Sequence, residues 1–364
     1  MGPNPFLGIV FHWLGGLASA SCYLPFRKIR HWSWEVYWLL QGAFAWLVAP
    51  ALVGLVLVPA AFAILRVAPH QSIGYAYMWG FLWGFGGLTF GLSVRYLGIA
   101  LGYAIALGLC TVFGTLMPPI FKGEFHAIVT ETSGQVILLG LGVCVAGIVF
   151  SAAAGLSRER EISDQDKKKV IEELSFVKGV LVAVFAGIMS ACFAYGLAAG
   201  KPIAQLSAQW LLVHHRADLW QNLPVLIVVL WGGFTSNFLW CAWLLVKNRS
   251  AKQYFEGSKH GATPAANYLL SAAAGTLWYL QFFFYSMGQT KMGKYDFSSW
   301  TLHMASIIIF STLWGIMLHE WRGTSRRTRV LVGVGLFLLV GSTLVVGYGN
   351  YLKAQETVTV ALPR

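Results

Sequence analysis

Apolar residues occur in ten segments of about twenty residues each, separated by shorter stretches that hold most of the charged residues. A helix needs about 20 apolar residues to cross a bilayer core of about 30 Å. Only helices and closed barrels satisfy every backbone polar group within lipid. The pattern therefore predicts an all-α integral membrane protein with ten transmembrane helices. The segments span 6–26, 36–58, 73–95, 99–121, 135–155, 176–199, 222–246, 266–289, 299–318 and 329–350.

The longest polar interruption, 156–178, follows the fifth segment and divides the chain into halves that resemble each other weakly, in the same order throughout. The matching pairs are 16–20 with 187–191, 80–83 with 275–278, 113–116 with 310–313, and 140–142 with 333–335. An odd number of helices per copy turns the second copy upside down, an arrangement typical of secondary transporters. The sequence thus predicts two inverted five-helix repeats, 1–155 and 176–364, joined by a charged linker, 156–175.

The charges predict the orientation of the chain. Hydrophobic residues make up 57% of the sequence and charged residues 11%, and the net charge is +12. With ten spans, 18 of the 26 Lys and Arg residues fall on one side, which the positive-inside tendency makes cytoplasmic. Both termini are therefore expected outside and the 156–175 linker inside. This distribution argues against a nucleic-acid partner, and the bilayer is the expected environment.

Ionisable groups at membrane depth are functional candidates because they are expensive to bury there. His12 lies in the first segment and His303 in the ninth, and a histidine changes charge near neutral pH. Either could take a proton from outside, although a hydrogen-bonded structural histidine is equally compatible with the pattern. Glu35 and Asp296 stand at segment ends, where solvation or the helix dipole is the ordinary explanation and proton coupling the alternative.

Two predicted helical faces carry polar and aromatic side chains of the kinds that bind a sugar. On the first segment His12, Gly16, Ser19 and Tyr23 recur at three or four residues and share one face. On the eighth, Trp278, Gln281 or Phe282, and Tyr285 form another, and Trp83 is the counterpart of Trp278 in the first half. Aromatic rings stack on apolar C–H faces while a few polar groups bind hydroxyls. The predicted substrate-binding residues are His12, Ser19, Trp83, Trp278, Gln281 and Tyr285; interfacial anchoring is the rival explanation for the tryptophans.

An enzyme is not expected. His319 and Glu320 resemble the start of a zinc-binding HExxH motif, but Gly323 stands where the second histidine is required. The five cysteines all fall inside apolar segments without CxxC spacing, so no metal or catalytic site and no cofactor is predicted.

Four stretches of the chain are distinctive: HWLGGLASASCYLPFRKIRHWSWE (12–35), GFLWGFGGLTFGLSVRYLG (80–98), WYLQFFFYSMGQTKMGKYDFSSWTLHM (278–304) and the His-Glu-Trp at 319–321. They resemble the bacterial L-rhamnose–proton symporters, which belong to the drug/metabolite transporter superfamily. The resemblance implies ten helices in two inverted repeats in the inner membrane and uptake of L-rhamnose with a proton as coupling ion. It places His12, Ser19, Trp83, Arg95, Trp278, Gln281, Tyr285, Asp296 and His303 at matching positions.

One departure concerns selectivity. The family pattern carries an asparagine near positions 86–87, whereas this chain has Gly86 and Gly87. Loss of a polar contact can shift selectivity, so the preferred sugar can differ from that of the family. The expected substrate is L-rhamnose or a closely related 6-deoxy sugar. The remaining alternative is a proton-independent facilitator or an exporter of another small metabolite on the same fold. The oligomeric state is left open and is compatible with a monomer.

Overall fold

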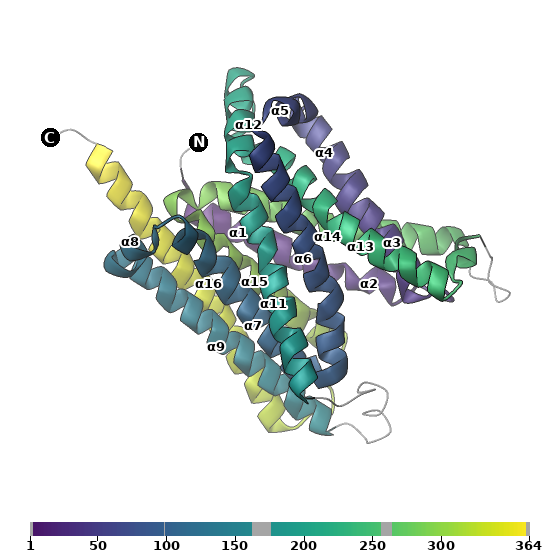
Figure 1. Cartoon of the computed structure of the whole chain (residues 1–364). Helices are drawn as coiled ribbons and strands as arrows, with labels where there is room; N and C mark the ends of the chain where they lie inside the picture. The colour runs from purple at the N-terminus through teal and green to yellow at the C-terminus, as the bar shows by residue number, and fades with distance from the viewer. Residues whose placement is uncertain (1–2, 98, 162–175, 256–263, 362–364) are drawn as a thin grey trace. The chain divides into compact units, whose positions relative to one another are not determined.

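The computed structural model describes residues 3–97, 99–161, 176–255 and 264–361, and no strand occurs among them (Figure 1). Each of the ten predicted segments coincides with a helix. In chain order they are α1 (Pro5–Ser21) followed by α2 (Tyr23–Phe26), α3 (Trp34–Gly42) continued by the π-helix η1 (Ala43–Val48) and α4 (Ala49–Leu57), α6 (His70–Leu97), α7 (Ile99–Phe121), α9 (Thr132–Glu161), α11 (Phe176–Ala199), α13 (Leu223–Lys247), α14 (Pro264–Lys291), α15 (Ser299–Met317) and α16 (Arg326–Ala361).

Eight of these helical stretches are long and apolar enough to cross a membrane: α1 with α2, α3 to α4, α7, α9, α11, α13, α15 and α16. Helices α6 and α14 are not among them, although each has 28 residues. Their sequences are rich in Gly, Tyr, Trp and Ser, which lower the mean hydropathy. The all-α membrane fold is therefore confirmed in its coarse form, by eight candidate spans.

Shorter helices occupy several connections: α5 (Ala61–Val67), α8 (Phe125–Thr130), α12 (Lys201–Val213) and the 3-10 turns η2 (Asp218–Trp220), η3 (Ala251–Tyr254) and η4 (Gly293–Ser298). Helix α12 occupies most of the connection between the predicted segments 176–199 and 222–246, which the apolar pattern alone does not mark as helical. Ile203 and Leu211 are buried, while Gln205 and Gln209 are exposed. This apolar face has helical spacing but is too short to read as a span.

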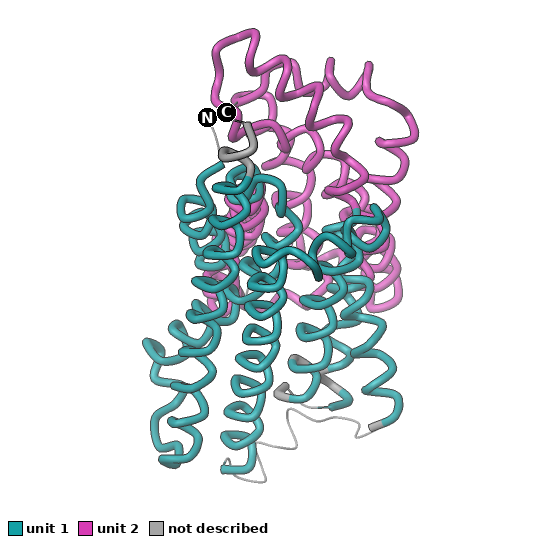
Figure 2. Tube along the Cα trace, turned by 90° about the vertical axis from the view of Figure 1, so that its left-hand side faces the viewer, with its two compact units in different colours: residues 1–17, 86–195, 287–364 teal, residues 18–85, 196–286 magenta. Residues whose placement is uncertain are grey.

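The described chain forms two compact units (Figure 2). Unit 1 comprises residues 1–17, 86–195 and 287–364, and unit 2 comprises 18–85 and 196–286. Each unit therefore draws on both halves of the sequence, and four helices, α1, α6, α11 and α14, each contribute residues to both. The repeat boundaries at 1–155 and 176–364 stay a prediction. Most of the 156–175 linker, from residue 162 onward, lies outside the described residues.

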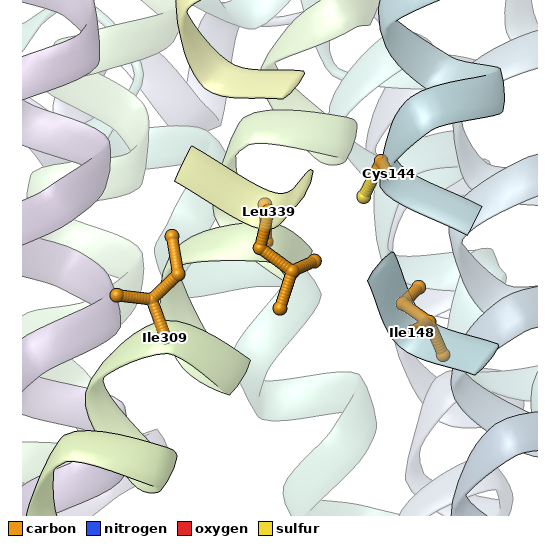
Figure 3. Close-up of a cluster of buried hydrophobic side chains, with 5 residues drawn as sticks. Cys144, Ile148, Ile309 and Leu339 are labelled. Atoms are coloured by element: carbon orange, nitrogen blue, oxygen red, sulfur yellow. The ribbon is translucent and has the colours of Figure 1, made fainter. Parts of the chain in front are cut away.

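In unit 1, α9 and α16 pack together along most of their length. Glycines on either helix allow this approach: a Cβ at Gly147 would lie 2.8 Å from Cγ of Leu339, and one at Gly335 would lie 2.7 Å from Oγ of Ser151. Helix α15 completes the apolar core, in which Ile309 and Leu339 face the α9 side chains Cys144 and Ile148 (Figure 3). Small residues of this kind let membrane helices pack closely.

At each end of the α9–α16 pair, hydrogen bonds to a glutamate carboxylate connect the two helices. At one end Glu131 accepts hydrogen bonds from Tyr295 and Lys353. At the other end Glu161 accepts 2.6 Å and 2.7 Å hydrogen bonds from the hydroxyls of Ser325 and Thr328, at the start of α16. The pair is thereby fixed in an antiparallel register.

In unit 2, α6 and α13 approach backbone to backbone. A Cβ at Gly80 would overlap the carbonyl of Val229, and one at Gly232 would overlap the carbonyl of Tyr77. A Cβ at Gly84 would lie 2.8 Å from the carbonyl oxygen of Gly233. The glycine-rich spacing of this stretch therefore serves packing here, whereas Gly87 and Gly91, further along α6, have open space around them.

Candidate functional site

Unit 2 contains an aromatic cluster made of Trp38, Trp46, Trp83, Trp278 and Phe282, drawn from the α3–η1 segment, α6 and α14. Trp46 is central, with its ring centroid 6.0 Å from that of Trp83 and 6.3 Å from that of Trp278. Trp38 lies 5.7 Å from Trp278, and Phe282 lies 5.4 Å from Trp83. All four pairs meet nearly edge to face, which is a favourable geometry for aromatic rings.

The π-helical backbone around Trp46 sets the direction of its ring. Trp46 lies in the π-helix η1, where the wider turn shifts side chains relative to an α-helical face. The ring folds back over Gly42, where a Cβ would lie 2.6 Å from a ring carbon. Glycine at position 42 is therefore required for this placement, and π-helical turns are frequently found at functional sites.

Two further contacts fix the cluster from α13. The indole N–H of Trp38 donates a 3.0 Å hydrogen bond to Oδ1 of Asn237. The amide of Asn237 in turn donates to the carbonyl of Gly233 at 2.9 Å, within its own helix. The Trp83 ring lies directly against Gly233, where a Cβ would be 2.5 Å from ring carbons. Trp38 and Trp83 are thus oriented by one turn of α13.

Several polar atoms around the cluster are buried without a hydrogen-bond partner among the described residues. They are the indole nitrogens of Trp46 and Trp278, both amide atoms of Gln41, and Nε2 of Gln281. A buried polar group without a partner costs about 1–3 kcal/mol, so such groups are rare unless a ligand or water completes them. The set is neutral and consists of flat rings with scattered donors, which matches a polyhydroxylated neutral ligand better than an ion.

The structure brings together some of the predicted substrate residues. Trp83 and Trp278 both contact Trp46, and Gln281 follows Trp278 by three residues on α14, so the two share a helical face. Tyr285 is buried on the next turn of the same helix. Ser19 is buried on α1 within unit 2. His12, by contrast, belongs to unit 1.

Unit 1 contains a histidine pair, His12 of α1 and His303 of α15. Both side chains are buried, and their helices approach closely one turn away, where a Cβ at Gly16 would overlap Cβ of Ser306. A Cβ at Gly288 would lie 2.8 Å from the His12 ring, and the His303 ring lies 6.0 Å from that of Trp300. Two protonated imidazoles would repel each other strongly in such surroundings, so the pair is suited to hold one proton at a time.

The two carboxylates at segment ends have different surroundings. Glu35 lies in the first turn of α3 and is buried, where it accepts a 3.0 Å hydrogen bond from Asn248 and a 2.7 Å one from Ser250. These bonds connect the start of α3 to the end of α13 and account for its burial. Asp296 is half-buried in η4, shortly before α15 begins. The proton-coupling roles of both stay predictions.

The asparagine of the family pattern would fit at only one of the two glycines that stand in its place. A Cβ at Gly86 would lie 2.5 Å from the backbone nitrogen of Ser190, so there is no room for a side chain. Gly87 is exposed, and a Cβ at this position would meet no atom within 4 Å. An asparagine could therefore be accommodated at 87 but not at 86. The side chain of Arg95 lies outside the described residues.

Sequence reasoning missed Trp38, Gln41 and Trp46. Trp46 lies in the π-helix Ala43–Val48, and Gln41 lies just before it, in the last turn of α3. The available signal was a buried-type amide flanked by tryptophans inside an otherwise apolar segment. It was hidden because a π-helix is not readable from hydrophobic periodicity.

Comparisons with known proteins identify the same family over nearly the whole chain. The family model of the L-rhamnose-proton symport protein (RhaT) matches residues 1–351. A protein of Cronobacter sakazakii named L-rhamnose-proton symporter is 34% identical over 346 residues, which cover 94% of this chain and 97% of that protein. Proteins with the same name from Klebsiella pneumoniae (strain 342) and Yersinia pestis (strain Pestoides F) are 35% and 34% identical, with the same shares covered.

Proposed function

The chain belongs to the L-rhamnose-proton symport protein family, and from this membership we propose that it takes up L-rhamnose, or a closely related 6-deoxy sugar, together with a proton by alternating access. The family is one of transporters rather than enzymes. The observation that carries the proposal is the match over residues 1–351, and the aromatic cluster supplies a site of suitable chemistry.

The sugar is proposed to bind at the aromatic cluster. Trp83 and Trp278 offer ring faces for the apolar side of the sugar, and the methyl group of a 6-deoxy sugar increases that apolar surface. The indole of Trp278 and the amide of Gln281 are placed to donate to hydroxyls, because neither donor has a partner among the described residues. Ser19 and Tyr285 complete the proposed substrate residues, and a role of His12 in binding stays a prediction.

The proton is proposed to bind at the histidine pair. Both rings are buried, on helices that approach closely at Gly16 and Ser306, so a proton on one ring disfavours a proton on the other. We propose a stoichiometry of one proton per sugar. A membrane potential of 100 mV contributes about 2.3 kcal/mol per charge, roughly a fifty-fold accumulation of sugar. The proton is then the coupling ion and no other cofactor is needed.

The architecture is proposed to be ten transmembrane helices in two inverted five-helix repeats, as in the drug/metabolite transporter superfamily. Helices α6 and α14 have 28 residues each, about 42 Å at 1.5 Å per residue, which exceeds the bilayer core. The four helices that contribute to both units are the first and third apolar segments of each half, α1 and α6, then α11 and α14. Such a matched division is what a duplicated unit would produce.

The charge distribution supports an orientation in the bacterial inner membrane in which both termini lie outside and the 156–175 linker is cytoplasmic. The protein is proposed to act as a monomer. Reporter fusions at the C-terminus and within the linker test the orientation. Activity of a periplasmic reporter at residue 364 and of a cytoplasmic reporter in the linker is expected, and the reverse pattern would overturn the orientation.

The decisive experiment uses purified protein in weakly buffered proteoliposomes, with L-rhamnose, L-fucose, L-mannose and L-lyxose added separately while external pH is followed. External alkalinisation with L-rhamnose is expected. Sugar counterflow without any pH change would instead favour the facilitator, or an exporter of another metabolite. Neither transport nor thermal stabilisation by any of these sugars would reject the proposed substrate class.

A further inference from the structure

Gln41 differs from the other polar groups near the aromatic cluster. It lies in the last turn of α3, fully buried, and neither atom of its amide makes a hydrogen bond to a described residue. A primary amide can donate two hydrogen bonds and accept two. Leaving all of them unmade in an apolar interior is strongly unfavourable. A buried amide without hydrogen bonds indicates a ligand that binds reversibly and supplies the missing partners.

The neighbours of Gln41 place it beside the proposed sugar. Trp38 precedes it by three residues on the same helical face, and the Trp46 ring folds back over the adjacent Gly42. Both tryptophans contact Trp278. On the other side, a Cβ at Gly275 would overlap the backbone carbonyl of Gln41, so α14 approaches α3 closely at this turn.

The chemistry of the surrounding groups gives Gln41 a distinct role. The indole nitrogens of Trp46 and Trp278 and the Nε2 of Gln281 are all donors. A sugar hydroxyl, however, also has a proton to donate. Gln41 adds an acceptor, Oε1, to this donor-rich set, and it can pair with one hydroxyl as both donor and acceptor.

We propose that Gln41 is a specificity-determining sugar-binding residue, whose amide exchanges hydrogen bonds with one hydroxyl of the sugar bound at the aromatic cluster. This inference rests on the proposed function and deepens it, because it assigns selectivity for one hydroxyl to one side chain. A site that hydrogen-bonds a substrate hydroxyl discriminates strongly against the analogue that lacks it.

The test compares wild-type protein with Gln41→Leu in proteoliposomes, using L-rhamnose and its singly deoxygenated derivatives at C1, C2, C3 and C4. For L-rhamnose, the concentration that gives half-maximal proton uptake is expected to rise about tenfold in the variant. For the one derivative that lacks the bound hydroxyl, wild type and variant are expected to agree within about twofold, because the interaction is already absent.

Thermal unfolding supplies an independent readout. Replacing a buried amide that has no partner by an apolar side chain is neutral or stabilising, so the melting temperature of sugar-free Gln41→Leu is expected to equal or exceed that of the wild type. A structural role for Gln41 would lower it. Gln41→Met, which keeps the side-chain length, is the second variant, and Gln209→Leu makes the same change at an exposed position of α12.

Each outcome has a separate meaning. If the wild type transports L-rhamnose, then an equal loss of apparent affinity in Gln41→Leu for all five sugars, or no loss for any, overturns the role of Gln41 alone. A wild-type protein that neither binds nor transports any of the sugars rejects the proposed function, and the inference with it.

Discussion

The aromatic cluster of unit 2 and the histidine pair of unit 1 are both buried, yet they are built in opposite ways. The cluster holds neutral side chains, and five polar atoms in and around it make no hydrogen bond to a described residue. The histidine pair consists of two titratable rings packed tightly against glycine and tryptophan. The first region is suited to a ligand that supplies the missing hydrogen bonds, and the second to a change of charge in place.

The difference suggests that sugar binding and proton binding can be separated by mutation. A sugar site needs several weak contacts whose loss is graded, because each neutral hydrogen bond contributes about 0.5–1.5 kcal/mol. A proton site needs one titratable group whose loss is absolute. The following predictions test this contrast, beginning with the largest expected effect.

Replacing His12 by asparagine removes titration with a smaller polar side chain, which adds no bulk to the close packing against Gly288. Sugar-driven alkalinisation is expected to fall to background, while counterflow of labelled L-rhamnose continues. The two are measured side by side in proteoliposomes, with His126→Asn, at an exposed histidine of unit 1, as the control. Unchanged proton uptake in both His12→Asn and His303→Asn would remove the histidine pair from the mechanism.

Trp278→Ala removes a ring that contacts both Trp38 and Trp46. We expect L-rhamnose affinity to weaken about 100-fold, or about 2.7 kcal/mol, from lost stacking and a lost indole donor. Thermal stabilisation by the sugar measures the change. Trp240→Ala, at an exposed tryptophan of the same unit, should leave affinity within about twofold. Equal effects in the two variants would argue against a sugar site in the cluster.

Gly233→Ala tests whether the position of Trp83 matters, because the added methyl group would meet the Trp83 ring at 2.5 Å. A displaced ring should raise the half-saturating sugar concentration about tenfold with little effect on the maximal rate. The matched control is Gly87→Ala on α6, where the new methyl group meets open space. If Gly233→Ala transports like the wild type, the orientation of Trp83 is unimportant.

The smallest effect is expected at Glu131, outside the candidate spans. Hydrogen bonds from Lys353, and then from Tyr295, lower the pKa of Glu131 below its ordinary value. A lowered native pKa contributes stability above the unfolded-state pKa of about 4.3, and this stability is lost as pH falls through the native value.

Glu131→Gln should therefore lower the melting temperature at pH 7 by about 1–3 °C and reduce its fall between about pH 5 and pH 3. Transport at pH 7 should be unchanged. Glu124→Gln, at an exposed glutamate nearby, is the control. An identical acid response in Glu131→Gln and the wild type would show that the bond to Lys353 contributes nothing measurable.

The sequence predicted the helices well because a span needs an apolar run, and such runs are visible in the chain. It predicted α12 badly, because a thirteen-residue helix buries only Ile203, Ala204, Ser207 and Leu211 and lacks the length of a span. Ten crossings and the inverted repeat remain predictions. They depend on α6 and α14, whose glycine, tyrosine, tryptophan and serine residues lower their mean hydropathy.

The candidate site was predictable in part. Trp83 and Trp278 were identified from the repeat, and their common contact with Trp46 agrees with a shared location. Trp46 and Gln41 were not, because a π-helical turn changes which residues share a face without altering the apolar pattern. The stripe from His12 to Tyr23 was drawn as one face, but α1 ends at Ser21 and its residues divide between the two units.

The four helices that contribute to both units also constrain how the protein is made. Unit 1 contains residues from 1–17 through 287–364, and unit 2 extends to residue 286. A ribosome that has inserted the first half of the chain has therefore completed neither unit. The helices that are inserted first therefore lie in the bilayer without their packing partners until the second half is synthesised. Biogenesis thus depends on each early helix being stable in lipid while its packing surface is still uncovered.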